Sequence, residues 1–170
     1  MKKIVTVNTG EIKITGGEAD LESSPIGSCV VVVLLDEKSK TGGMAHIMLP
    51  GKAPEKENVI CGRYAANAID ILIDELAARG LSPERLKAVV AGGGNVLKRE
   101  NDTIGTDNLV SVNRLLKEYK IEVVAESVEG TERKTVRFDT ERGIIFYTKG
   151  DEGKKALYRI LKNPQMLTDS

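Results

Sequence analysis

The sequence has few of the residues that usually build a protein's core or mark its ligands. It contains no tryptophan, and aromatic side chains make up only 4% of its 170 residues, so a core must be built from valine, isoleucine, leucine and alanine. Lysine plus arginine and aspartate plus glutamate are equal at 25 each, which gives a formal net charge of +0. Without a basic excess, the sequence gives no sign of binding to nucleic acid or an anionic membrane. A protein or a small molecule is the better expectation for a partner.

Long apolar runs and cysteines are scarce as well. The longest uninterrupted apolar run, Val30 to Leu35, is far shorter than the roughly 20 residues that span a bilayer. The N-terminal segment MKKIVTVNTGEIKIT becomes polar and acidic too early for a secretory signal peptide. The two cysteines, Cys29 and Cys61, are too few for a disulfide framework and lack metal-site spacing. We therefore expect a cytoplasmic protein with free thiols, no membrane insertion, no metal and no other cofactor.

The length suits a single domain over residues 1–170, with about 150–170 as a C-terminal tail. Short β-branched segments alternate with turns, and a few stretches carry apolar residues at helical spacing. The expected helices cover Arg63–Arg79, about Asn108–Tyr119 and, as a short final helix, Lys154–Leu161. The expected strands cover Lys3–Val7, Glu11–Thr15, Cys29–Leu35, Met44–Leu49, Leu86–Ala91, Ile121–Glu126, Lys134–Phe138 and Ile144–Thr148, and Gly16–Gly27 is expected to be a loop. Strands joined mostly by hairpins predict an α+β fold, with mixed or antiparallel sheets flanked by two main helices.

The single histidine, His46, lies 17 residues after Cys29. If Asp36 and Thr41 close a hairpin between the two strands, Val31 lies opposite His46. Cys29 and His46 are then diagonal neighbours on one face of the sheet, with backbones roughly 7–8 Å apart. A register shifted by one residue would place them on opposite faces, so their proximity depends on this pairing.

A cysteine beside a histidine is suited to attack on an amide. A free thiol is only slightly ionised at neutral pH, and a neighbouring imidazole activates it and then protonates the departing ammonia. A third group usually orients the imidazole, and Ser23, in the polar segment before Cys29, is the candidate. Gly27 and Ser28 place backbone N–H groups at a loop-to-strand junction, where they could hold an oxyanion.

Structural roles compete with these interpretations. A free cysteine at the start of a strand, or a lone histidine in an apolar strand, is more often a core residue than a catalyst. Their combination on one hairpin beside Gly-Ser brings the two interpretations to parity. The glycine run in Ala91–Asn95 resembles a phosphate loop in glycine content only, because the Gly-Lys-Ser/Thr ending is absent. Close backbone packing beside the site is the favoured role for these glycines.

The segments Gly27–Val30 and Met44–Pro50, with the sequences GSCV and MAHIMLP, resemble the CheD family of chemoreceptor glutamine deamidases. Shorter matches follow at Gly62–Ala65, Ala91–Gly94, Ile104–Asn108, Gly130 with Arg133, and Asp139–Gly143, so that the likeness covers about Ile4 to Thr148. The resemblance implies hydrolysis of receptor glutamines to glutamates through a thioester. It also implies a layered fold and a Cys–His chemistry similar to those of toxins that deamidate a glutamine of small GTPases.

The family's catalytic cysteine and histidine fall on Cys29 and His46, and its third residue, generally threonine, falls on Ser23. Serine keeps the hydroxyl but lacks the methyl group that restricts its rotamer, so His46 is expected to be held less firmly. The partners implied are the cytoplasmic domains of chemoreceptors, as substrates, and a CheC-type phosphatase.

Three hypotheses stay open at this point. The favoured one is a glutamine deamidase. The second is a largely non-catalytic adaptor that binds the CheC phosphatase or a receptor. The third is another acyl-transfer enzyme, a methylesterase or a transglutaminase, that uses the same thioester at Cys29. Because all acyl-transfer options share this intermediate, only their products separate them.

Overall fold

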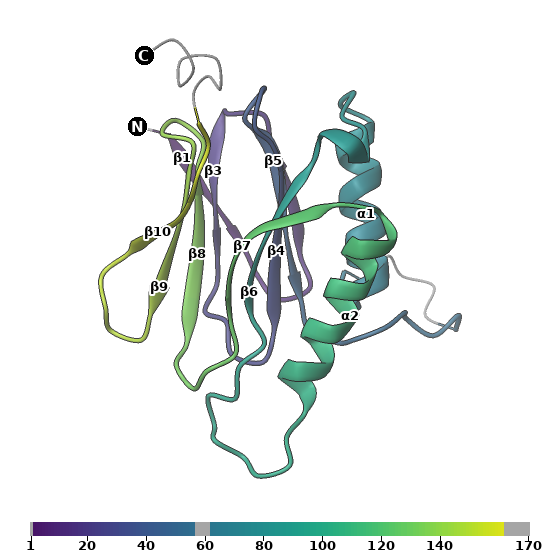
Figure 1. The fold of residues 1–170 in the computed structure, drawn as a ribbon, viewed down its shortest axis with the longest axis vertical. Coiled ribbons are helices and arrows are strands. Elements are labelled where there is room, and N and C mark those ends of the chain that lie inside the picture. The colour runs from purple at the N-terminus through teal and green to yellow at the C-terminus, as the bar shows by residue number, and fades with distance from the viewer. Residues whose placement is uncertain (1, 57–61, 162–170) are drawn as a thin grey trace.

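Two five-stranded sheets lie face to face, and two helices cover the outer face of one of them (Figure 1). This computed structural model describes residues 2–56 and 62–161. The first sheet has the strand order β1-β3-β8-β9-β10 and the second β2-β5-β4-β6-β7. The strands are β1 Lys3–Val7, β2 Ile12–Thr15, β3 Ala19–Ser23, β4 Val30–Asp36, β5 Thr41–Ile47, β6 Lys87–Gly92, β7 Glu122–Val128, β8 Lys134–Asp139, β9 Ile144–Lys149 and β10 Lys155–Arg159, and the helices are α1 Ala65–Ala77, α2 Ile104–Glu118 and the 3₁₀ turn Pro83–Arg85.

Both sheets are mixed, because β1 runs parallel to β3 and β6 runs parallel to β7 while the other pairs are antiparallel. The predicted α+β class is therefore confirmed. Both helices lie on the second sheet, on the side away from the first sheet (Figure 1). Within the described residues, neither helix is long and apolar enough to cross a membrane.

Strand β4 is buried along its whole length, which explains its run of valine and leucine. Because side chains alternate along a strand, it contributes to two cores. Val30, Val32 and Leu34 pack under the helices, whereas the alternate residues pack between the two sheets. Cys29, the residue directly before β4, contacts the core between the two sheets.

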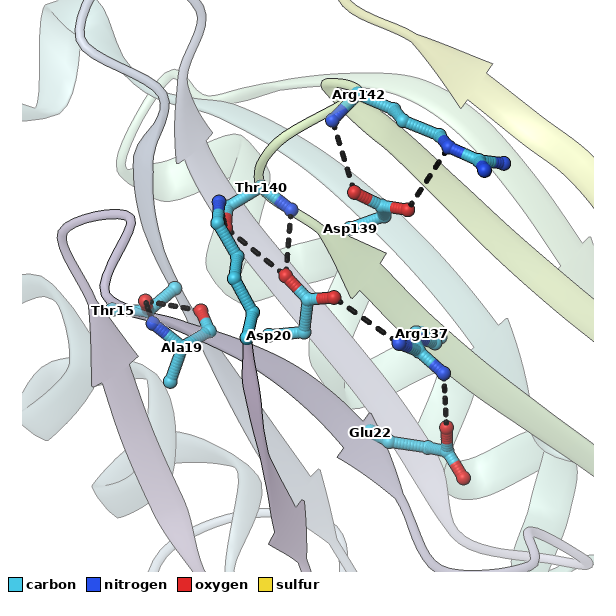
Figure 2. Close-up of polar contacts among 9 residues, drawn as sticks. Thr15, Ala19, Asp20, Glu22, Arg137, Asp139, Thr140 and Arg142 are labelled. Carbon is cyan, nitrogen blue, oxygen red and sulfur yellow. Dashed lines mark hydrogen bonds and ion pairs between the residues drawn. The ribbon is translucent and has the colours of Figure 1, made fainter.

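The prediction of a loop over Gly16–Gly27 is wrong for the centre of that segment, which forms β3 between β1 and β8. Asp20 is buried, but its carboxylate accepts hydrogen bonds from the backbone N–H and hydroxyl of Thr140 and pairs with Arg137 at 3.2 Å, as Figure 2 shows. Burial opposes ionisation of Asp20, but these hydrogen bonds outweigh it and lower its pKa. Arg137 also lies 3.6 Å from Glu22. Partners distant in sequence thus allow an acidic segment to form an internal strand.

The predicted helix over Lys154–Leu161 is also wrong, because β10 pairs with β9 at the edge of the first sheet. Leu157 and Tyr158 pack against the core between the sheets, and Ile160 is buried there. The N–H of Ile160 donates to the carbonyl of Gly143 at 2.7 Å. An available sheet edge therefore overrides a weak helical pattern.

Other predicted elements are confirmed with shifted ends. Helix α2 begins at Ile104, four residues before the predicted start, and β5 begins at Thr41, which shortens the preceding turn. The second cysteine, Cys61, lies outside the described residues.

Candidate active site

The hairpin register that would bring the cysteine and histidine together is present. Asp36 pairs with Thr41, and Val31 pairs with His46, as predicted. Directly paired residues share a face of the sheet, and both Val31 and Cys29 contact the core between the sheets. Cys29 and His46 therefore lie on the same face of the second sheet, which is the face turned toward the first sheet.

The ring of His46 joins the two sheets. It is 0% exposed, and its Nδ1 lies 3.1 Å from the carbonyl oxygen of Val7, the last residue of β1. Nδ1 must carry the proton to donate to a carbonyl, so we infer that the lone pair is on Nε2. Nε2 is buried and has no hydrogen-bond partner in the described part of the chain. A free imidazole lone pair is what a general base requires.

Cys29 lies at the edge of a pocket of about 220 Å³. The pocket is lined by Gly27–Cys29, Gly94–Leu97, Asp102 and Arg133. Burial raises the pKa of the Cys29 thiol, although a hydrogen bond with the Thr9 side chain acts in the opposite direction. Burial also lowers the pKa of His46, against the opposing effect of the Val7 carbonyl. The two shifts favour the neutral form of both the thiol and the imidazole at rest.

The backbone around Cys29 is held through its carbonyl groups. The carbonyls of Gly27 and Cys29 accept hydrogen bonds from the N–H groups of Gly94 and Gly93, at 3.0 and 2.8 Å. The carbonyl between them, that of Ser28, accepts from the side-chain amide of an α2 asparagine at 2.9 Å. Gly27 and Ser28, the predicted oxyanion residues, thus have fixed peptide planes beside the pocket.

The glycine run Gly92–Gly94, which begins at the last residue of β6, allows this close approach. Gly92 has φ +108°, and a Cβ atom there would lie 2.2 Å from the carbonyl oxygen of Cys29. Gly93 has φ +69°, and a Cβ atom would lie 2.4 Å from the Leu109 side chain. Both the conformation and the space therefore require glycine. The packing role favoured by the sequence is confirmed for these residues.

Ser23, the predicted third residue, is buried at the end of β3. Its hydroxyl accepts a hydrogen bond from the N–H of Val136 at 2.9 Å, and no hydrogen bond between Ser23 and His46 is found among the described residues. The hydroxyl beside the imidazole belongs to Ser24, whose Oγ lies 3.3 Å from His46 Nδ1. Sequence reasoning missed Ser24, because spacing alone cannot choose between adjacent serines.

The two serines are expected to respond differently to alanine substitution. Ser24→Ala removes a contact to the imidazole, and a hydrogen bond of about 1 kcal/mol corresponds to roughly a fivefold loss of kcat. Ser23→Ala leaves the buried N–H of Val136 unpaired, so we expect about 1–3 kcal/mol of lost stability and little change in kcat. Steady-state kinetics and thermal melts of both variants test this. A large loss of kcat confined to Ser23→Ala would restore Ser23 as the orienting residue.

No group of three or more histidine, cysteine, aspartate or glutamate side chains in residues 2–56 and 62–161 is placed to hold a metal ion. Cys29 carries a thiol and His46 an imidazole on one sheet face, and the peptide planes before Cys29 are held by hydrogen bonds.

Comparison with known proteins places this chain in a family. The family model described as CheD chemotactic sensory transduction matches residues 48–149. A relative from Chlorobium luteolum, named probable chemoreceptor glutamine deamidase CheD, is 37% identical over 91% of this chain and 77% of its own length. Proteins named chemoreceptor glutamine deamidase CheD from Thermotoga maritima and Halalkalibacterium halodurans are 32% and 33% identical, over 91% and 92% of this chain and 96% and 100% of their own lengths. The chain therefore belongs to the CheD family.

Proposed function

We propose that this protein hydrolyses glutamine side chains of chemoreceptors to glutamate, with Cys29 as nucleophile and His46 as general base. The observation that carries the proposal is the buried, unpartnered Nε2 of His46, whose opposite ring nitrogen is held by Val7. It lies on the same sheet face as Cys29, which borders the pocket. The names of the relatives support a glutamine deamidase acting on chemoreceptors.

The proposed reaction has two halves. In the first, Cys29 Sγ attacks the side-chain amide carbon while its proton moves to His46 Nε2, and the amide oxygen becomes an oxyanion held by backbone N–H groups. The C–N bond then breaks, and the proton on Nε2 leaves with ammonia. In the second half, water attacks the thioester, His46 accepts its proton, and glutamate and the thiol are released. Water is the only co-reactant, so no cofactor is required.

The neutral resting pair has consequences for the pH dependence. Because burial raises the pKa of Cys29, we expect its alkylation by iodoacetamide to keep rising with pH beyond the ordinary thiol range. Because burial lowers the pKa of His46, acid should reduce kcat/KM only below the ordinary histidine pKa of about 6.5. The measurement is the pH profile of both rates. Rapid alkylation that is constant across neutral pH would instead indicate a preformed thiolate–imidazolium pair.

We also propose a single domain over residues 1–170 that works in the cytoplasm, where receptor signalling domains and reduced thiols occur together. Receptor cytoplasmic domains are the proposed substrates, and a CheC-type phosphatase is a second proposed partner. Met48 and Leu97 are 40% and 63% exposed. Leu97 lines the pocket, and Met48 follows β5 at the same end of the hairpin. Exposed apolar side chains beside a reactive group suit contact with a protein substrate.

The test is incubation of a receptor cytoplasmic domain with the wild-type protein, followed by peptide mass spectrometry. Deamidation adds about one mass unit per converted glutamine, since NH2 is replaced by OH after thioester hydrolysis. A transglutaminase would join peptides with loss of ammonia, and a methylesterase would remove methyl groups from modified glutamates. A receptor that binds without any change in mass would replace the deamidase proposal with the adaptor.

A further inference from the structure

The α2 side chain that holds the Ser28 carbonyl is Asn108, which is 0% exposed. Its Nδ2 donates to the carbonyl oxygen of Ser28 at 2.9 Å and to that of Met48 at 3.1 Å. An amide NH2 has two hydrogens, so each carbonyl can receive one. Ser28 precedes the nucleophile, and Met48 follows His46 by two residues. One buried amide thus joins the two chain segments that carry the candidate catalytic pair.

The Asn108 amide lies at the point where the hydrogen-bonded pairing of β4 with β5 ends. The pairing of β4 with β5 ends at Val30 and Ile47. Beyond that pair, the N–H groups of Met48 and Leu49 both donate to the carbonyl of Arg63 at 2.8 Å. The chain after β5 therefore turns away from the segment before β4, and the helix side chain bonds across the gap.

The direction of the Cys29 N–H follows from this contact. In a trans peptide the N–H points opposite to the carbonyl, and no cis peptide is present in the described residues. The carbonyls of Gly27 and Cys29 point to the β6 side, where Gly94 and Gly93 donate to them. The Ser28 carbonyl points the other way, so the Cys29 N–H is directed to the β6 side. The pocket wall formed by Gly94–Leu97 lies on that side.

We propose that Asn108 is a positioning residue that fixes the Ser28–Cys29 peptide so that the Cys29 N–H donates to the oxyanion. This inference rests on the proposed deamidation. The inference adds the Cys29 N–H to the predicted oxyanion site. The Ser28 N–H is a poorer candidate, because it is opposite to the Gly27 carbonyl in the same peptide and therefore points away from β6.

The cost of burying this amide supports a specific role. The Oδ1 atom of Asn108 is buried and has no hydrogen-bond partner in residues 2–56 and 62–161. A buried acceptor without a hydrogen bond destabilises the fold, whereas an apolar side chain of similar shape would avoid that cost. The two N–H donors are therefore the feature that distinguishes asparagine from a packing residue here. Aspartate has nearly the same shape but, when ionised, offers no donor.

The test compares Asn108→Asp with a matched control, Ser111→Ala. Ser111 is buried on the same helix, and its hydroxyl accepts a hydrogen bond from the N–H of Gly51 at 2.9 Å. The control therefore loses one contact between α2 and a loop without touching either catalytic segment. Loss of an oxyanion donor typically lowers kcat by about 10²–10³-fold, and we expect a misdirected one to cost at least about tenfold with KM little changed.

Alkylation of Cys29 by iodoacetamide separates positioning from general damage, because displacement at carbon creates no oxyanion. In Asn108→Asp, the alkylation rate of the Cys29 peptide should stay within about threefold of wild type while deamidation falls, and in Ser111→Ala both should be unchanged. Thermal melts monitor folding, and Asn108→Ala removes both donors without adding a charge if the aspartate variant folds poorly.

Two outcomes would overturn the inference. Unchanged deamidation by both Asn108 variants would show that the peptide is held without the amide. Equal losses of alkylation and deamidation would show that Asn108 acts on the thiol or on the fold. The wild-type reaction distinguishes these results from failure of the deamidase proposal. Wild type that converts no glutamine rejects the proposed function and, with it, this inference.

Discussion

Cys29→Ala is expected to abolish conversion of receptor glutamines while leaving the protein folded. In the proposed mechanism the thiol sulfur is the attacking atom, and water held at the same place is far less nucleophilic, so we expect a loss of at least about 10⁴-fold in kcat. The side chain is only partly buried and contacts the edge of the core between the sheets. Its truncation should therefore lower stability by no more than about 1–2 kcal/mol. Peptide mass spectrometry gives the first quantity and a thermal melt gives the second.

Two controls make the Cys29 result specific. Cys61→Ser should retain full turnover, because the proposed chemistry uses one thiol. Cys29→Ser should be inactive, because a serine hydroxyl in this setting is a much weaker nucleophile than a thiol. Deamidation that survives in Cys29→Ala would require a different nucleophile and would reject the mechanism.

His46→Ala is expected to lower kcat by about 10²–10⁴-fold, the usual contribution of a general base. It should also lower stability, because the vacated volume is buried and the carbonyl of Val7 loses one of its two donors, keeping only the N–H of Ser24 at 3.1 Å. His46→Gln keeps a polar side chain of similar size and tests whether the rate follows the base rather than the cavity. We expect the glutamine variant to be as slow as the alanine variant but more stable.

Alkylation of Cys29 supplies the discriminating measurement for His46. If the imidazole acts as a base during attack, its loss should leave iodoacetamide alkylation at high pH unchanged, because the thiolate then forms without help. A His46 variant with wild-type kcat would mean that the imidazole only packs between the sheets.

The sequence could predict the parts of the site that depend on local patterns. The apolar run Val30–Leu35 and the turn closed by Asp36 and Thr41 are enough to place His46 on the face of Cys29. The packing role of the glycine run at the end of β6 is also predictable, since the Gly-Lys-Ser/Thr ending of a phosphate loop is absent. These features need no knowledge of the rest of the chain.

The features that were missed depend on contacts between distant segments. β3 looked like a loop because its acidic residues find partners more than a hundred positions later, in the salt bridge of Asp20 with Arg137. The contact of Ser24 with His46 depends on how β3 ends beside Val7, and the role of Ser23 stays a prediction. Asn108 ends the Ile104–Asn108 match to the family, but the sequence assigns it no contact, because its two carbonyl partners lie 60 and 80 positions earlier. None of these pairings leaves a periodic signal in the sequence.

The hydrogen bond from His46 to Val7 makes the geometry of the candidate site depend on how the two sheets pack. His46 is carried by one sheet, but the carbonyl oxygen that sets its tautomer belongs to the other. A slight parting of the sheets would therefore release the imidazole before any strand unpaired. Turnover should then be more sensitive than any spectroscopic probe of secondary structure to substitutions at side chains such as Phe138, which is buried between the sheets and does not line the pocket. We therefore expect the catalytic rate to report how closely the two sheets pack against each other.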